Sequence, residues 1–303
     1  MRGNGVSLFN QKAMIVYNLN KSVDAEELNS CIQNLKWVEC KPTDMSTVGF
    51  VSPAFNDDLI FECKGHLLLA IRKEEKILPS NVIKKETQHK VEKLEGEQGR
   101  KLKKTEKATI KDEVIYSLLP RAFSKYSTVY IWINTIDHQI VVFTGTSKNA
   151  ESSLALLRKA IGSLPVTPLK FDSIEMLLTN WVKDNSIPTQ LQLNGEAELI
   201  AILEEGGIAK FKKQDLISDE ILTHIEAGKL VTNLYLKFQD RIDFTINNDF
   251  IFKKIKFSEK IIGTNEDIDR KDVSLRFQSD FYLVAEELSK LIKYLSDLFK
   301  KTY

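Results

Sequence analysis

The chain has 303 residues, 43% of them hydrophobic and 28% charged, which is the composition of a globular protein with a sizeable core in one or two domains. No apolar run approaches the roughly 20 residues that span a bilayer, the run 13–17 is too short for a signal-peptide core, and Cys31, Cys40 and Cys63 include no Cys-x-x-Cys pair. We therefore expect a cytoplasmic protein with reduced thiols, and the net charge of +1 confines any nucleic-acid contact to part of the surface.

In the first half of the chain, capping residues, prolines and β-branched runs mark the elements. Asp24, followed three residues later by Glu27, is typical of a helix N-terminus. Pro79-Ser80 precedes a long polar helix, and Pro120 ends the next one. The predicted elements, in order, are strand 13–19, helix 24–35, loop 41–55, hairpin 59–63/66–71, helices 81–106 and 107–119, hairpin 128–135/139–144 and helix 147–161.

The second half reads as a smaller α+β region after Pro165 and Pro168. Its predicted elements are helix 173–183, strand 190–193, a helical or strand piece through 204, strand 208–211, a helix capped at Ser218, a meander 230–238/241–246/250–257 and an amphipathic helix 283–300. We expect an α+β fold with mainly antiparallel sheets. The predicted division is residues 1–168, which include the basic helical segment 80–119, and residues 169–303.

The segment from Arg72 to Lys111 carries thirteen Lys or Arg and seven Glu, a local charge of +6, so the remaining residues sum to −5. Basic residues recur at helical spacing, which predicts a row of cations about 5–6 Å apart that can follow phosphates without reading bases. Val91, Leu94 and Leu102 would face the opposite, buried side. The candidate DNA-binding residues are Arg72, Lys73, Lys76, Lys84, Lys93, Arg100, Lys101, Lys103, Lys104, Lys107 and Lys111.

A solvated surface helix with internal Glu–Lys pairs remains an alternative interpretation of this segment. The segment contains no Phe, Tyr or Trp, the side chains on which single-stranded bases stack. We therefore expect binding to double-stranded DNA to be at least as strong as binding to single-stranded DNA.

Pro120 is followed by Arg121 and Phe123, which we expect on a projecting turn. An arginine and an aromatic residue on a loop are typical of interface anchors. The alternative is that Phe123 packs on its own core.

Seven blocks of the chain resemble the bacterial RdgC family of recombination-associated proteins, and the resemblance runs from about Phe9 to the final helix. They are RKEEKILPS, EGEQGRKLKKTEK, KDEVIYSLLPRAFS, LALLRKAIGSLPV, KKQDL, HIEAGK and NEDIDRKD. The resemblance implies a homodimer closed head-to-head and tail-to-tail into a ring, with positive charge around a hole that double-stranded DNA threads.

The same resemblance implies a non-enzymatic, nucleoid-associated protein without a cofactor that binds DNA with little sequence preference. It would act in recombination and replication and restrain the recombinase RecA by competing for DNA. It also implies that Arg121 and Phe123 lie at a ring-closing contact, and that Lys213 and Gln214 of the KKQDL block belong to the same gate.

Two other functions are open at this point. Glu266, Asp267, Asp269 and Asp272 form an acidic cluster that could hold magnesium in a nuclease, although a capped, solvated loop before the final helix explains them as well. Alternatively, the charged helix could dock an acidic protein partner in an adaptor of DNA repair. No metal site is expected.

Overall fold

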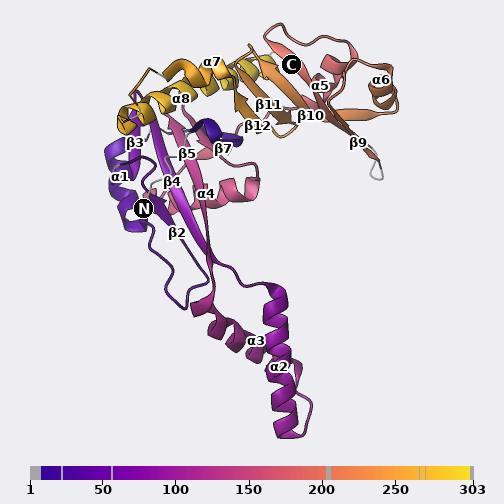
Figure 1. Ribbon diagram of the computed structural model, residues 1–303. Coiled ribbons are helices and arrows are strands. Elements are labelled where there is room, and N and C mark those ends of the chain that lie inside the picture. Colours follow the sequence, from indigo (N-terminus) through magenta and orange to yellow (C-terminus); the bar gives the residue numbers. More distant parts are fainter. Residues whose placement is uncertain are drawn as a thin grey trace.

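The computed structural model describes residues 8–21, 23–55, 57–202, 206–265, 267–269 and 271–300. It confirms an α+β fold built on one large antiparallel sheet (Figure 1). The sheet order is β2-β4-β5-β6-β1-β12-β11-β10-β8-β9, with β3 paired to β4 and β7 paired to β1. Strands from before and after residue 168 therefore share one sheet and meet where β1 pairs with β12.

The strands are β1 (Ala13–Leu19), β2 (Ser46–Val51), β3 (Ile60–Cys63), β4 (His66–Lys76), β5 (Ser124–Asn134), β6 (Gln139–Val142), β7 (Val166–Pro168), β8 (Leu191–Ala201), β9 (Ile208–Lys212), β10 (Lys229–Phe238), β11 (Ile242–Asn247) and β12 (Ile251–Phe257). The α-helices are α1 (Ala25–Ile32), α2 (Ser80–Gln98), α3 (Lys104–Leu118), α4 (Ser147–Ile161), α5 (Ile174–Lys183), α6 (Asp219–Glu226), α7 (Glu259–Ile262) and α8 (Val273–Lys300).

The two faces of the sheet are covered differently in its two halves. Alternation along β1 sends Met14 and Val16 into the main core beneath α5, α6 and α8, and sends Ile15 and Tyr17 into a second core beneath α1 and α4. The second core ends at Ile251 of β12. Among the described residues, β8–β12 therefore carry helices on one face only, and their other face is open (Figure 1).

Local signals account for most element ends. The Asp24 side chain accepts a hydrogen bond from the Glu27 backbone N–H at 2.9 Å and starts α1 as predicted. Gly162 follows α4 with φ of 76°, a left-handed conformation that favours glycine. The predicted hairpin 128–135/139–144, the helix 173–183 and the meander 230–257 are present within a few residues of their expected bounds.

The loop prediction for 41–55 was wrong, because β2 occupies Ser46–Val51 and pairs with β4. Gly49, which favoured a loop, is instead required by a close approach: a Cβ at this position would lie 2.5 Å from the Trp37 Cα. The chain at residues 35–37 runs beside this strand, where Lys36 and Phe50 form a parallel β-bridge and the Trp37 N–H donates to the Phe50 carbonyl at 2.8 Å.

The strands β4 and β5 form a long β-ribbon that carries α2 and α3 at its end, and β2 pairs with the other edge of β4 as far as Glu75 (Figure 1). We call residues 72–125, the ribbon end with these two helices, the arm. The helices pack against each other through a small core of their own, made by Val91, Leu102, Ile110 and Val114. The predicted burial of Val91 and Leu102 is confirmed.

The helix boundary predicted at 106/107 was wrong. The first helix ends at Gln98, Gly99 adopts φ of 65°, and α3 begins at Lys104. The left-handed glycine ends α2, and the Glu106 carboxylate accepts the Lys103 N–H at 2.7 Å to cap α3. Residues 99–103 therefore form a turn between two helices that fold back on each other.

Several elements are longer than predicted, notably β4, β5, β8 and α8. The added residues of β4 and β5 are polar ribbon residues, which lack the apolar pattern on which the prediction relied. Within the described residues, no helix is both long and apolar enough to cross a bilayer.

Candidate nucleic-acid interface

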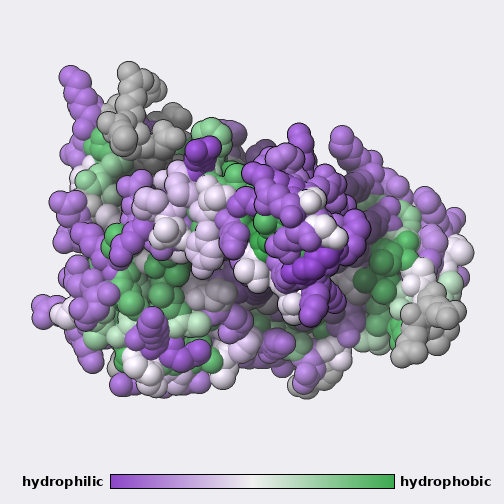
Figure 2. All heavy atoms as spheres, turned by 90° about the horizontal axis from the view of Figure 1, so that it is seen from below, coloured by the Kyte–Doolittle hydropathy of each residue, from purple (hydrophilic) through white to green (hydrophobic). Residues whose placement is uncertain are grey.

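The arm gathers positive charge on a projecting, hydrophilic element. It carries fifteen Lys or Arg against nine Asp or Glu, a net charge of +6. In Figure 2, which views the molecule from below with the arm toward the viewer, hydrophilic residues cover most of the arm. The excess predicted for 72–111 thus persists over the whole structural unit, although Asp112 and Glu113 of α3 offset part of it.

The predicted single-helix stripe was wrong, because the turn interrupts it. Arg100, Lys101 and Lys103 lie in the turn, whereas Lys104, Lys107 and Lys111 lie on α3. Lys84 and Lys93 belong to α2, which runs back along α3. The cations are therefore spread over two helices and the turn that joins them.

Part of the predicted set is neutralised within the chain. Glu95 pairs with Lys101 at 2.9 Å and with Lys107 at 3.0 Å, and Glu106 pairs with Arg100 at 2.6 Å. Hydrogen bonds from Lys101, the Leu102 N–H and Lys107 lower the pKa of Glu95 to about 2. Those from Arg100 and the Lys103 N–H lower the pKa of Glu106 to about 2.

Two weaker pairs complete the internal charge network of the arm. Lys93 lies 4.0 Å from Glu97, and Lys73 lies 3.1 Å from Glu75. The Arg72 guanidinium lies 5.2 Å from the centre of the Trp37 ring. The internal Glu–Lys pairing that stood as an alternative is therefore present for part of the set.

The remaining predicted cations carry the excess charge. Within the described residues, no ion pair involves Lys76, Lys84, Lys103, Lys104 or Lys111. Ammonium groups without a carboxylate partner are the ones whose field extends into solvent and attracts phosphate.

The projecting turn after Pro120 is confirmed. The Phe123 carbonyl accepts a hydrogen bond from the Ile77 N–H at 2.8 Å, which fixes the backbone at the root of the helical hairpin. The Phe123 side chain is 85% exposed, so it does not pack on its own core. An aromatic ring held this far out of a core on a fixed backbone is suited to contact another molecule.

Lys213 and Gln214 lie directly after β9, where Lys213 has φ of 57°. The Gln214 N–H donates to the Gly195 carbonyl at 3.4 Å, and its side-chain amide donates to Glu220 at 3.3 Å. Gly195 is needed here, because it has φ of 67° and a Cβ would lie 3.1 Å from the Gln214 carbonyl oxygen.

A shallow cavity of about 530 Å³ opens beside Lys213 and Gln214. Six strands of the sheet separate β5, which follows Phe123, from β9, which precedes Lys213. A single chain therefore does not bring Phe123 to Lys213 and Gln214.

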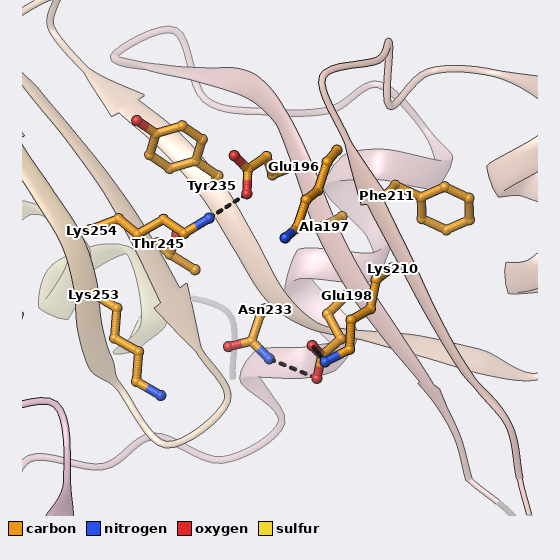
Figure 3. Close-up of a pocket in the computed structure, with 11 residues that line it drawn as sticks. Glu196, Ala197, Glu198, Lys210, Phe211, Asn233, Tyr235, Thr245, Lys253 and Lys254 are labelled. Carbon is orange, nitrogen blue, oxygen red and sulfur yellow. Dashed lines mark hydrogen bonds and ion pairs between the residues drawn. The ribbon is translucent and has the colours of Figure 1, made fainter.

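The open face of β8–β12 contains a basin of about 360 Å³ that the sequence interpretation missed (Figure 3). Four lysines line it: Lys210, Lys212, Lys253 and Lys254. They come from IAKFK and IFKKIKF, where lysines occupy the solvent face between buried apolar residues. Exposed lysines next to buried apolar residues were the available signal, and this signal is weaker than a continuous charge run.

Of the predicted acidic cluster, Glu266 lies outside the described residues. Asp272 accepts a hydrogen bond from the Leu275 N–H at 3.0 Å at the start of α8, and Asp269 accepts one from the Lys271 N–H at 2.9 Å. Both carboxylates thus hold backbone N–H groups. The described part of the chain contains no group of three His, Cys, Asp or Glu arranged to hold a metal ion.

Comparison with known proteins agrees with the resemblance. Residues 9–302 match the family model described as "Putative exonuclease, RdgC". The chain is 50% identical over 287 residues to the "Recombination-associated protein RdgC" of Proteus mirabilis (strain HI4320), covering 93% of this chain and 95% of that protein. It is 49% identical over 289 residues to the protein of the same name from Yersinia pestis (strain Pestoides F), covering 94% and 95%. The chain therefore belongs to the RdgC family of recombination-associated proteins.

Proposed function

We propose that this protein is a non-enzymatic DNA-binding protein that encloses double-stranded DNA as a ring-shaped homodimer. The observation that carries the proposal is the arm, a projecting element with a net charge of +6 whose lysines are in part unpaired. Such a surface neutralises phosphates, releases counterions and makes affinity depend steeply on salt. It lacks paired side chains suited to base edges, so it discriminates little among sequences.

The shape of the subunit supports enclosure. The arm descends from the sheet on the side away from α8, and the open face of β8–β12 is also the face opposite α8 (Figure 1). Both surfaces thus border one concave side. Two copies that face each other would surround a space lined by the arm and by the basin lysines.

Ring closure needs contacts at both ends of this concave side. Phe123 offers one: we propose that it meets the cavity beside Lys213 and Gln214 of a second subunit. At the end of the β8–β9 hairpin, Ile202 is 70% exposed and Ile208 is 58% exposed. These two isoleucines are the candidate for the second contact, since exposed apolar side chains gain most from burial against another copy.

A ring of this kind restrains RecA by occupancy. DNA held in the concave space is not accessible to a recombinase that must coat it. The proposal thus links the recombination association of the family to competition for DNA in recombination and replication, and it places the protein on the nucleoid.

Retention on DNA of different topology tests the ring. The protein is bound to closed circular and to linear duplexes of equal length, and dissociation is followed after a shift to high salt. An enclosing ring leaves linear DNA through its ends and remains longer on circles. Equally fast loss from both forms contradicts enclosure. A separate mobility-shift measurement with a random duplex tests DNA binding itself: a shift that Lys103→Glu and Lys104→Glu abolish distinguishes a DNA-binding protein from a protein-binding adaptor.

A metal-dependent nuclease is the second candidate, because the description of the matching family model names an exonuclease. Asp267, Asp269 and Asp272 are the carboxylates that such an activity would draw on. The measurement is incubation of supercoiled and linear DNA with the protein and magnesium. Cleavage that is lost in Asp267→Asn would establish the nuclease, and intact DNA would exclude it.

A further inference from the structure

The basin on the open face of β8–β12 carries a net charge of +2, from four lysines and two glutamates among its lining residues. It is far along the sheet from the arm, since β9, β10 and β12 line it and β5 leads to the arm. The basin is therefore a separate cationic surface on the concave side of the subunit.

Carboxylates hold two of the four lysines. Glu196 pairs with Lys254, and Glu198 pairs with Lys210 at 2.8 Å while accepting a hydrogen bond from Asn233 at 3.4 Å (Figure 3). The Lys210 and Lys254 side chains remain 60% and 51% exposed, so these pairs are open to exchange with another anion.

The other two lysines, Lys212 and Lys253, make no ion pair within the described residues. Figure 3 shows the Lys253 side chain extending away from Glu196. Lys253 pairs in register with Thr245 and Lys212 with Glu196, so the two lysines stand at opposite sides of the basin.

The chemistry of the lining fits a phosphodiester backbone. Lys210 and Lys212 alternate along β9 and so project from one face about 7 Å apart, while Asn233 and Tyr235 add neutral hydrogen-bond donors. These groups can contact phosphate and sugar oxygens, and none is arranged as the bidentate pair that reads a base edge.

We propose that this basin is a second contact site for the backbone of duplex DNA, in which phosphates replace Glu196 and Glu198 as partners of Lys254 and Lys210. The inference rests on the proposed DNA-binding function. The two carboxylates hold the lysines in place in free protein and compete with DNA when it is bound. Each exchange swaps one ion pair for another, which limits affinity and favours movement along the duplex.

Substitutions of opposite sign test the exchange. Lys212→Gln with Lys253→Gln removes two cations, so the slope of log Kobs against log salt falls by about 2, and affinity at 0.15 M salt falls about fivefold for each lysine removed. Glu196→Gln with Glu198→Gln removes the competing anions and tightens binding by a similar factor. The control is Lys183→Gln with Lys293→Gln, two exposed lysines on α5 and α8, which cover the other face.

The outcomes separate the inference from the function on which it rests. If both basin variants bind as the parent does while Lys103→Gln with Lys104→Gln weakens binding, the basin is not a DNA contact and the proposed function stands. If the arm variant also binds normally, the DNA-binding proposal itself is wrong.

A second measurement needs no variant and so does not depend on folding. Acetylation of lysine amines on the unmodified protein is compared with and without duplex DNA by mass spectrometry. The inference predicts protection of Lys212 and Lys253 and none of Lys183 and Lys293. Equal modification of Lys212 and Lys253 in both samples overturns it.

Discussion

Arg100 and Glu106 are joined by two hydrogen bonds, Nη1 to Oε2 at 3.0 Å and Nη2 to Oε1 at 2.6 Å, across the turn between α2 and α3. The same carboxylate caps α3 through the Lys103 N–H. The guanidinium therefore closes the turn, and its charge is matched inside the protein. The basic residues of the arm thus fall into those that pair with a carboxylate of the arm and those that make no ion pair among the described residues.

Arg100→Gln is accordingly expected to leave the salt slope of DNA binding nearly unchanged, because it removes a paired charge. Lys103→Gln with Lys104→Gln is expected to lower that slope by up to about 2, because each of these lysines can neutralise one phosphate. Fluorescence titration of a labelled duplex at several salt concentrations measures both. A drop of about 1 for Arg100→Gln would show that Arg100 leaves Glu106 to bind phosphate.

The small core of the arm is separate from the cores of the sheet, so the arm can unfold while the sheet remains folded. Ile110→Ala removes buried methylene groups and is expected to destabilise the α2–α3 pair by about 2 kcal/mol. Hydrogen exchange should accelerate in α2 and α3 and stay unchanged in β10–β12. Uniform acceleration throughout the chain would instead mean that arm and sheet unfold together.

The sequence predicted those parts of the fold that have a local signal. Asp24 with Glu27 marked α1, and the alternation along β10, β11 and β12 marked the meander. Gly49 led to a wrong loop prediction. A glycine is required there because the backbone of Trp37 lies too close for a side chain, and contacts between distant segments have no local signature in the sequence. A glycine such as Gly99 weakens a helix, but only its left-handed conformation shows that the chain reverses there.

The residues of the candidate nucleic-acid surface were visible in the sequence only in part, for a similar reason. A run of lysines in 72–111 is visible in one dimension, whereas the basin collects Lys210, Lys212, Lys253 and Lys254 from strands that pairing brings together. Tertiary structure also decides which cations have a carboxylate partner. The spacing of Glu95 from Lys101 and Lys107, six and twelve residues, fits no single helix, and the reversal of the chain creates both contacts.

Glu74 gives a pH dependence to the root of the arm. This carboxylate is 1% exposed and accepts hydrogen bonds from the Ser124 hydroxyl at 2.6 Å and the Cys40 N–H at 2.8 Å, which lower its pKa below the ordinary 4.5. A carboxylate with a lowered folded-state pKa contributes stability above its unfolded pKa and loses it as pH falls. The parent protein should therefore lose stability below about pH 4.5.

Glu74→Gln is expected to be less stable at neutral pH and to lose less stability between about pH 5 and pH 3 than the parent. Denaturant unfolding at successive pH values measures this change. Glu75→Gln is the matched control, since Glu75 is exposed and pairs only with Lys73 among the described residues. Parallel pH profiles for Glu74→Gln and the parent would show that Glu74 is not the linked group.

Gly195→Ala tests the proposed gate, Lys213 and Gln214, without changing its charges. The new Cβ would lie 3.1 Å from the Gln214 carbonyl oxygen on a backbone with φ of 67°, so the segment 213–215 must shift. We expect faster loss from closed circular DNA and unchanged binding to short linear duplexes. Reduced binding to both would mean that the shift reaches the basin, whose residues Glu196 and Tyr235 also line the gate cavity.

Phe123→Ala removes the most exposed aromatic side chain of the arm, and the fold should tolerate it because the ring is 85% exposed in the free chain. If the Phe123 side chain holds one subunit against the other, the dimer of the variant opens more often. Its retention on closed circular DNA then falls toward its retention on linear DNA. Tyr116→Ala is the matched control, since Tyr116 is a 64% exposed aromatic residue on the same arm.

Retention is measured after a salt jump with unlabelled competitor DNA, on circles and on linear duplexes of equal length. The expected result is a loss of retention on circles for Phe123→Ala alone, with unchanged association, because the residue acts on closure and makes no phosphate contact. Equal retention of the Phe123 and Tyr116 variants on circles would mean that the contact that closes the dimer lies elsewhere on the subunit. Direct loss of DNA binding in Phe123→Ala would instead make the aromatic ring a DNA contact, as expected where bases stack on exposed side chains.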